Sequence, residues 1–399
     1  MKLIDVLIFL ERLMIIVYRA TNKLFLSILL TLYSVTCMAN SAGGIPVTNK
    51  NISLKVNTQK NSATDLIIWN AESGGKGSSA DMPQPIDDYN FFGTMAWACT
   101  SNSDSAFGKC PNFIGNIYGA PLTSISLEFT EQNTGISKVL TLEGFNEKVD
   151  YSGHNLMSAA FAINSSASNY SIVAQSLLTV RLSKEQIESL PIGGEWYAKL
   201  ILHQWTYNPN RTKLVTWTAG ITINLVDNKN IQVYLPNYST ASPTVDLDLK
   251  RKQSPDRSPI LAGDVKIDAC LYDGYNAQSK KYDITFSSPS SKGENFYITN
   301  TMMNPNPKLS NTIPYQVWVS TPAAPSVVSK KVLPNTLFSF TGVNESTPKF
   351  VTLPNIPSPV YCTPWLINLK TADISQNTQA PGHYQGSLHL KFTPSSSSL

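Results

Sequence analysis

Four histidines are the residues of this chain best suited to acid–base chemistry near neutral pH. They stand at His154, His203, His383 and His389, in unrelated sequence contexts. Nucleophilic catalysis needs a base positioned beside a serine or cysteine, and none of the four lies in such a motif. The pattern favours surface or structural roles for all of them.

Two pairs of acids, Asp87-Asp88 and Asp246 with Asp248, are spaced so that they could flank a glycosidic bond. Adjacent acids on a loop and same-face acids on a strand are also ordinary surface features. The chain contains no P-loop, no Gly-x-Gly-x-x-Gly fingerprint and no clustered metal ligands. We therefore expect no cofactor, no metal and no enzymatic activity. A secreted glycan-acting hydrolase is the remote alternative.

Five cysteines are present, and Cys37 lies in an apparent secretory signal. The other four fall in pairs, one pair in each half of the chain. In an oxidising compartment the economical pairing is one disulfide within each half, Cys99–Cys110 and Cys270–Cys362. Free thiols or a metal site are the alternatives, but zinc would require paired cysteine or histidine spacings that are absent here.

The N-terminal residues indicate export. An apolar run, Leu24–Val35, follows basic residues and precedes small residues, which is typical of a signal peptide with cleavage near Ala39 or Ser41. We assign residues 1–41 to this signal. The basic region before the run is long, so a later start at Met14 is one interpretation and a membrane anchor another. No other segment approaches the roughly 20 apolar residues of a membrane span.

The charge of the two halves of the chain bears on whether it binds nucleic acid. Residues 40–227 carry 12 basic and 15 acidic side chains, and residues 228–399 carry 15 and 10. Neither half has the strongly basic field of a nucleic-acid-binding domain. We therefore expect no nucleic-acid partner.

Alternating apolar and polar residues predict strands through most of the chain. Ile125–Phe129 and Val139–Leu142 alternate on either side of a Thr-Gly turn and predict a hairpin. Turns recur about every ten residues, which is typical of β-sandwiches. Ser183–Leu190 is the exception, because its Ser-x-x-Gln spacing predicts a short helical turn with a capping box.

A polar turn around residues 227–230 is the best internal boundary, since the net charge changes sign across it. We predict an N-terminal domain over 42–227, a linker at 228–229 and a C-terminal domain over 230–399. Such a short linker predicts two domains that are held nearly rigid relative to each other.

The last apolar stretch, 382–394, predicts a strand with one buried face. Tyr384, Leu388, Leu390 and Phe392 fall on that face, and polar residues fall on the other. No later segment can pair with this strand. Either an earlier segment or a strand from another molecule must cover its edge, and strand addition is an established recognition mode.

The second half resembles the minor tip adhesins, or pilus initiators, of class 5 fimbriae, the type of colonization factor antigen I and of cable pili. The first half is similar more loosely. The matching segments are Asn230–Pro236, Cys270–Tyr275, Pro359–Cys362 and Gly386–Ser395, with Ile125–Glu131 and Leu190–Trp196 in the first half.

This resemblance implies two immunoglobulin-like β-sandwich domains in tandem, an adhesin domain and then a pilin domain. In that family the pilin domain lacks one strand. A periplasmic chaperone fills the gap first, and a donor strand from the major pilin replaces it during assembly at an outer-membrane usher. The chain is thus expected to leave through the periplasm and to stand at the fimbrial tip on the cell surface.

The resemblance also implies a receptor site for a host cell-surface glycan or glycoprotein, which relatives form with an arginine cluster. In this chain the three arginine positions hold Thr94, Thr206 and Tyr207. Aromatic residues and one cation lie close by and could stack on a sugar and contact its polar groups; these are Trp97, Trp205 and Arg211. One alternative is that both tryptophans are core residues. Another, favoured by the missing arginines, is that the subunit initiates assembly without adhering.

Overall fold

The computed structural model describes residues 44–77, 91–118, 122–150, 153–155, 160–167, 173–208, 210–302, 306–321 and 328–395. The predicted signal peptide, Asp87-Asp88 and the serines after Ser395 lie outside these residues.

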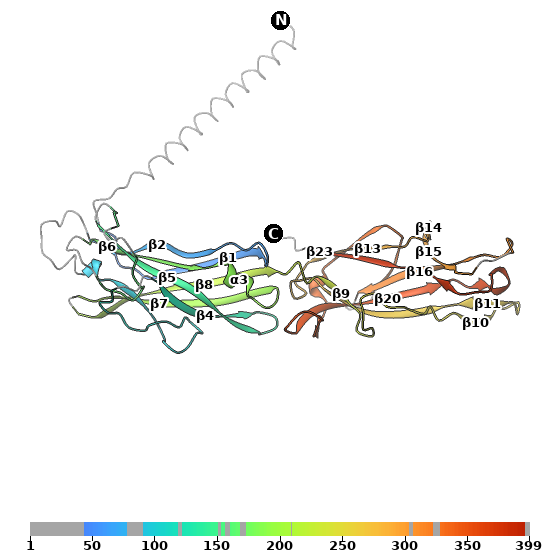
Figure 1. The fold of residues 1–399 in the computed structure, drawn as a ribbon, viewed down its shortest axis with the longest axis horizontal. Helices are drawn as coiled ribbons and strands as arrows, with labels where there is room; N and C mark the ends of the chain where they lie inside the picture. The colour runs from blue at the N-terminus through green and yellow to red at the C-terminus, as the bar shows by residue number, and fades with distance from the viewer. Residues whose placement is uncertain are drawn as a thin grey trace, which may run out of the picture.

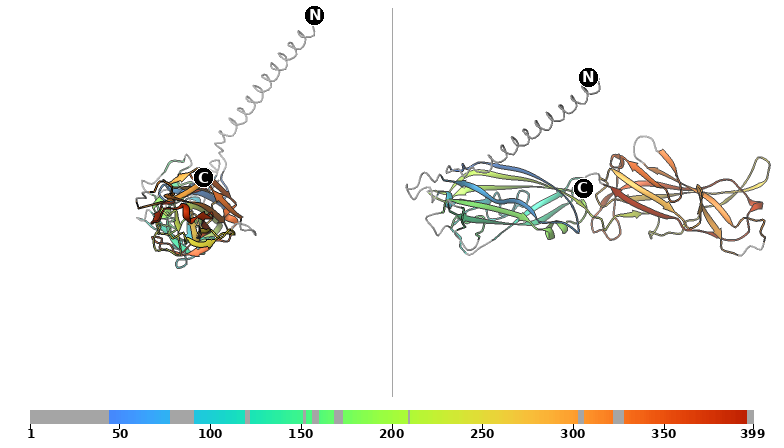
Figure 2. Two further views of the ribbon diagram at one scale, coloured as in Figure 1. Left: turned by 90° about the vertical axis from the view of Figure 1, so that its right-hand side faces the viewer. Right: turned by 90° about the horizontal axis from the view of Figure 1, so that it is seen from above.

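The chain forms two β domains that lie end to end along the longest axis (Figure 1). Seen along that axis, the domains superimpose in a narrow profile (Figure 2, left). The connection between them runs from β8 (Thr212–Val226) to β9 (Gln232–Tyr234). The prediction of an all-β chain with two tandem domains is confirmed.

Among its described residues, the first domain has eight strands and the short helix α3, and residues 91–93 are also helical. The strands and α3 are β1 (Lys50–Gln59), β2 (Leu66–Lys76), β3 (Ala96–Cys99), β4 (Thr123–Glu131), β5 (Ser137–Val149), β6 (Gln175–Leu182), α3 (Lys184–Glu188), β7 (Gly194–Thr206) and β8 (Thr212–Val226).

These strands form one sheet in the order β1-β8-β7-β4-β5-β6-β2, with β3 also paired to β7. The β1–β8 pair is parallel, and the pairs of β7 with β8 and of β4 with β5 are antiparallel. Side chains alternate between buried and exposed along β7, so one face of the strand lines the core. That core contains three tryptophans in edge-to-face contact, with Trp69 and Trp97 both packed against Trp217.

Helix α3 lies where the sequence predicts a helical turn, but the capping box does not form. Ser183 is the N-cap residue and makes no side-chain hydrogen bond to the helix. The Gln186 side chain instead accepts a hydrogen bond from the Thr141 backbone amide at 2.9 Å. The long-range contact to β5 replaces the local one, because an unpaired strand amide is a costly group to leave without an acceptor.

In the part of the second domain that the structure describes there are fifteen strands, many of them short, and two 3₁₀ turns. They are β9 (Gln232–Tyr234), β10 (Lys250–Gln253), β11 (Pro259–Ala262), β12 (Asp264–Tyr272), β13 (Lys281–Ser287), β14 (Ser291–Lys292), β15 (Asn295–Asn300), β16 (Thr312–Thr321), β17 (Val328–Val332), β18 (Leu337–Thr341), η2 (Val343–Glu345), β19 (Lys349–Val351), β20 (Val360–Thr371), β21 (Ile374–Ser375), η3 (Gln376–Thr378), β22 (Tyr384–Gln385) and β23 (His389–Ser395).

Two sheets of this domain enclose its core. The larger has the order β14-β15-β16-β20-β12-β9, and the smaller is β18-β13-β23. Between them, Tyr282 of β13 packs edge-on against Phe392 of β23, with ring centroids 4.8 Å apart. Its hydroxyl lies 2.9 Å from the Thr363 hydroxyl of β20, so the buried phenol keeps a hydrogen bond.

The two domains meet in a buried junction. The Asp227 amide donates to the Gly274 carbonyl at 2.8 Å, and the Asn276 side chain donates to the Gly193 carbonyl at 3.0 Å. Tyr272 of the second domain belongs to the same apolar cluster as the first-domain core. Burial here, followed by the effect of the Glu195 carboxylate, raises the pKa of Tyr275 to about 12. The contacts support the predicted rigid arrangement.

Candidate functional site

The six candidate receptor residues gather at the end of the first domain that is farthest from the second. Strand β7 begins at the junction and ends at Thr206, and β8 returns from there to the junction. Strand β3 pairs with the far end of β7, with Ala96 opposite Trp205. Residues 94–97 and 205–211 therefore come together at this distal end.

Three of the six are buried and offer no surface to a receptor. Trp97 is fully buried, with its ring 5.1 Å from that of Trp217. The Thr206 hydroxyl donates to the Phe91 carbonyl at 3.1 Å. Thr94 is also buried, and its hydroxyl accepts a hydrogen bond from the Asn208 amide at 3.4 Å. For Trp97 the core interpretation is correct, because its position on β3 faces the tryptophan core and not the solvent.

The remaining three residues form a solvent-facing group. Tyr207 and Trp205 are half-buried and pack against a small apolar cluster that includes Ile114. The Arg211 guanidinium is exposed and lies 4.9 Å from the centre of the Tyr207 ring. A guanidinium over an aromatic face is a stabilising cation–π pair.

Two further residues extend this group, and the sequence reasoning did not include them. Lys213 is the register partner of Trp205, and its ammonium nitrogen lies 3.2 Å from His203 Nε2. Burial, followed by the charge of Lys213, lowers the pKa of His203. His203 and Trp205 alternate at the end of β7, and Tyr207 continues that period-two spacing just beyond it, which was the available signal in the sequence. We call His203, Trp205, Tyr207, Arg211 and Lys213 the distal patch.

A fully buried lysine lies within the distal end of the domain. Lys148 Nζ donates to the Met95 carbonyl at 2.8 Å and to the Ser176 hydroxyl at 2.7 Å. Burial lowers the pKa of Lys148 well below its usual value. Nearby, the Gln204 amide donates to the Gly74 carbonyl at 2.6 Å. These bonds tie β2, β3, β5, β6 and β7 together behind the distal patch.

The terminal strand β23 is the second candidate site. On one side it pairs with β13, with Leu390 opposite Phe286 and Phe392 opposite Ile284. In the described part of the chain it is the last strand of its sheet, so its other edge has no strand partner. Leu388, Leu390 and Phe392 pack on the core yet stay only partly buried. An apolar strand with an open edge is a template for strand addition.

Tyr384 does not belong to this strand, contrary to the sequence prediction. It lies on β22, which pairs with β15 of the larger sheet. Its hydroxyl donates to the Ala380 carbonyl at 2.6 Å. The alternation therefore holds only for 388–392, because the chain crosses between sheets in the segment from β22 to β23.

Both predicted disulfides are present, which confirms the pairing. Cys99 and Cys110 close a short loop after β3, with Cα atoms 5.3 Å apart. Cys270 and Cys362 join the neighbouring strands β12 and β20, with Cα atoms 5.6 Å apart.

Asp87 and Asp88 lie outside the described residues, and Asp246 and Asp248 have local partners. No group of three metal-ligating side chains occurs among the described residues. Asp246 accepts a hydrogen bond from the Asp248 amide at 2.9 Å, and the Asp248 carboxylate pairs with Lys250. Both acids thus serve a local turn and its ion pair. None of the helices that the structure describes is long and apolar enough to cross a membrane.

Comparisons with known proteins cover both domains. The family model for the first domain of the CFA/I fimbrial subunit CfaE matches residues 38–228, and the model for the second domain matches residues 231–396. The curated CFA/I fimbrial protein of this family from Escherichia coli is 28% identical over 318 residues, which are 78% of this chain and 83% of the relative.

Two solved structures share the fold. CfaE, described as the adhesive subunit of the CFA/I fimbria of enterotoxigenic Escherichia coli, superimposes with a TM-score of 0.70 at 24% identity, covering 89% of this chain and 94% of CfaE. A chaperone–tip adhesin complex of CFA/I fimbriae contains a chain that superimposes with a TM-score of 0.62 at 22% identity, covering 88% of this chain and 97% of that one.

Proposed function

Because the chain belongs to the CfaE family of CFA/I fimbrial subunits, we propose that it is the adhesive tip subunit of a fimbria. Both domains of that family are matched, in order, over nearly the whole described chain. The first domain carries the contact with the host, and the second carries the contact with the pilus. The curated relative is a fimbrial subunit, which agrees with a non-enzymatic role.

The open edge of β23 is the observation that supports the assembly role. A donor strand from the major pilin would add its main-chain hydrogen bonds along this edge. Apolar donor side chains would then cover Leu388, Leu390 and Phe392, which the chain itself leaves partly exposed. Burial of a large apolar side chain contributes about 1.5–3 kcal/mol, so the added strand would stabilise the domain strongly.

The same edge requires protection before assembly. A periplasmic chaperone would occupy it first, and the solved chaperone–tip adhesin complex of a relative supports this partner. Exchange for the major pilin would follow at an outer-membrane usher. The subunit would then be the first to leave the cell and would stand at the fimbrial tip on the cell surface.

The distal patch supports the adhesive role. Trp205 and Tyr207 offer aromatic surface, and Arg211 and Lys213 supply two cations at one end of the molecule. Aromatic faces stack on the apolar face of a sugar ring, and a guanidinium binds a carboxylate. The patch thus fits a mildly acidic glycan on a host cell-surface glycolipid or glycoprotein.

A pilus initiator without adhesive function is the second candidate. The burial of Thr94, Trp97 and Thr206 favours it, because half of the expected receptor residues cannot touch a ligand. This candidate shares the assembly role and differs only at the distal patch.

A glycan-binding assay with the full mature chain distinguishes the adhesive tip subunit from the non-adhesive initiator. We expect saturable binding to sialylated glycans, and the double variant Tyr207→Ala/Arg211→Ala should weaken it at least about tenfold, which corresponds to about 1.4 kcal/mol. The matched control is Tyr197→Ala/Lys199→Ala, a tyrosine and a cation near the other end of β7. Equal binding by the double variant and the wild type, or no saturable binding at all, would favour the non-adhesive initiator.

The assembly role is tested by fusing a donor strand covalently to the chain. A mature chain fused at its C-terminus, through a short turn, to the N-terminal segment of its major pilin should be monomeric and should melt well above the unfused chain. The unfused fragment 230–399 should aggregate. A fragment 230–399 that stays monomeric and thermally robust without any partner would contradict the role of the open edge.

A further inference from the structure

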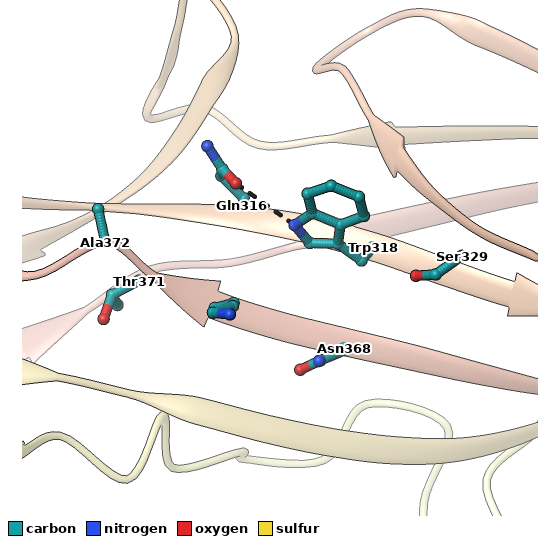
Figure 3. A pocket seen from close by; sticks show the side chains of 7 residues that line it. Gln316, Trp318, Ser329, Asn368, Thr371 and Ala372 are labelled. Carbon is teal, nitrogen blue, oxygen red and sulfur yellow. Dashed lines mark hydrogen bonds between the residues drawn. The ribbon is translucent and has the colours of Figure 1, made fainter.

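A cavity of about 370 Å³ opens on the outer face of the larger sheet in the second domain, away from both sites described above. Figure 3 shows the Trp318 indole, the Gln316 and Asn368 amides and the Ser329 hydroxyl around it, from β16, β20 and β17. Lys370 of β20 completes the lining. We call this cavity the sheet pocket.

Strand register places these residues on one face. Trp318 lies opposite Asn368, and Gln316 lies opposite Lys370. The alternate residues of the same strands, such as Val317 and Leu369, point into the core and are buried. The outer residues are therefore not part of the core, and Trp318 is a half-buried tryptophan on the solvent side of the sheet.

The side-chain amides of Gln316 and Asn368 lie beside the Trp318 indole, and their hydrogen bonding is typical of a ligand-binding site. Trp318 Nε1 donates to Gln316 Oε1 at 3.3 Å, which fixes the ring orientation. Asn368 Oδ1 is shielded from solvent and has no hydrogen-bond partner among the described residues. Leaving such an acceptor unpaired costs about 1–3 kcal/mol. A turn of the Asn368 amide would present it to the pocket, where a ligand hydroxyl would remove that cost.

We propose that the sheet pocket binds one neutral sugar residue of a glycan. The apolar face of the ring stacks on Trp318, a ring hydroxyl donates to Asn368 Oδ1, and the Lys370 ammonium donates to a second sugar oxygen. The volume lies near the lower end of ligand pockets and suits a single ring. Asp264 is the register partner of Lys370, so the local charge is balanced and favours a neutral ligand over an acidic one.

A second cavity of about 400 Å³ continues from the first and shares Lys370 and Thr371 with it. Its lining also includes Asp264 and Asp373, whose carboxylates are acceptors for hydroxyl groups. The sheet pocket therefore holds the terminal sugar of an oligosaccharide, and the next residue of that oligosaccharide lies over Lys370.

The test uses the full mature chain and a panel of immobilised neutral oligosaccharides ending in glucose, galactose or an N-acetylhexosamine, with sialylated counterparts. We expect saturable binding to at least one neutral glycan. Trp318→Ala should weaken it at least about tenfold, and Asn368→Leu should weaken it by a similar factor. Trp318→Tyr should retain part of the affinity, because a smaller aromatic face remains.

Two controls locate the binding. Phe350→Ala removes an exposed aromatic ring outside the pocket and should leave neutral-glycan binding unchanged. Arg211→Ala should also leave it unchanged, which separates this site from the distal patch. Far-ultraviolet circular dichroism and the melting temperature verify folding. The proposal is overturned if no neutral glycan binds, or if folded Trp318→Ala and Asn368→Leu bind as the wild type does.

Discussion

The environment of a residue, and not its type, decides its role in this protein. Trp97 is fully buried in the first core, where its ring packs against another tryptophan. Trp205 is half-buried on the outer face of the same region, and Trp318 is half-buried on the solvent side of its sheet. Only the last two can contact a ligand, because only they keep part of a ring surface in solvent.

Lys148 supports a prediction about pH. Its folded pKa is lowered by burial, so the folded protein holds fewer protons than the unfolded chain between that lowered value and the usual 10.5. Stability should therefore rise with pH in this window, by at most about 1.4 kcal/mol per unit. Lys148→Met should flatten the rise. Urea unfolding at pH 7, 8 and 9 measures it.

The matched control is Lys138→Met, which changes an exposed lysine on the same strand, β5. It should keep the wild-type dependence of unfolding free energy on pH. An unchanged slope in Lys148→Met would show that Lys148 keeps its proton in the folded state.

At the scale of elements, the open strand edge and the disulfide of the second domain lie in different sheets. Strand β23 is held on one side by β13 and is open on the other within the described chain. Strands β12 and β20 form the centre of the larger sheet and are covalently joined. The disulfide thus joins strands of the larger sheet, and the smaller sheet, whose edge is open, contains no cystine.

Removal of that disulfide should be costly. Cys270 and Cys362 are 92 residues apart, and closing a loop of this length contributes about 4.6 kcal/mol on the chain-entropy account. Cys270→Ala/Cys362→Ala should lower the free energy of unfolding by roughly that amount, as measured by urea denaturation of the complemented chain. Cys99→Ala/Cys110→Ala, with a separation of 11, should cost only about 3 kcal/mol. A larger loss of unfolding free energy in Cys99→Ala/Cys110→Ala than in Cys270→Ala/Cys362→Ala would contradict the dependence on loop length.

At the scale of the whole molecule, the backbones of the two domains approach each other closely at the junction. A Cβ on Gly193 would collide with the Gly274 carbonyl, and one on Gly274 would collide with the Asp227 carbonyl. Gly274 also has φ +72°, a conformation that favours glycine. Substitutions at these glycines are therefore expected to disturb the end-to-end arrangement of the domains (Figure 1).

Gly193→Ala should open the junction. The backbone must shift to accept the new methyl group, and overpacking of this kind costs about 1–3 kcal/mol. We expect a lower melting temperature and faster proteolysis at 227–231, measured by calorimetry and limited trypsin digestion. Gly220→Ala is the matched control, since the nearest atom to its added Cβ is 3.8 Å away. Equal behaviour of the two variants would contradict a tight junction.

The sequence by itself determined the fold class, the disulfide pairs and the apolar face of the last strand. The fold class and the strand face depend on local spacing, because alternation has a period of two residues. The disulfide pairs depend on each half holding two cysteines, which pair within a domain. The sequence also placed a helical turn at Ser183 but assigned Gln186 to the wrong partner. Local spacing does not reveal a competing contact from a distant strand.

Tertiary structure decided what the sequence could not. It buried Trp97, assigned Tyr384 to a different sheet and brought Lys213 beside Trp205. It also placed Trp318 across from Asn368, although the two lie far apart along the chain. The physical reason is register, because only the pairing of distant strands fixes which side chains share a face and which of those faces stays open to solvent.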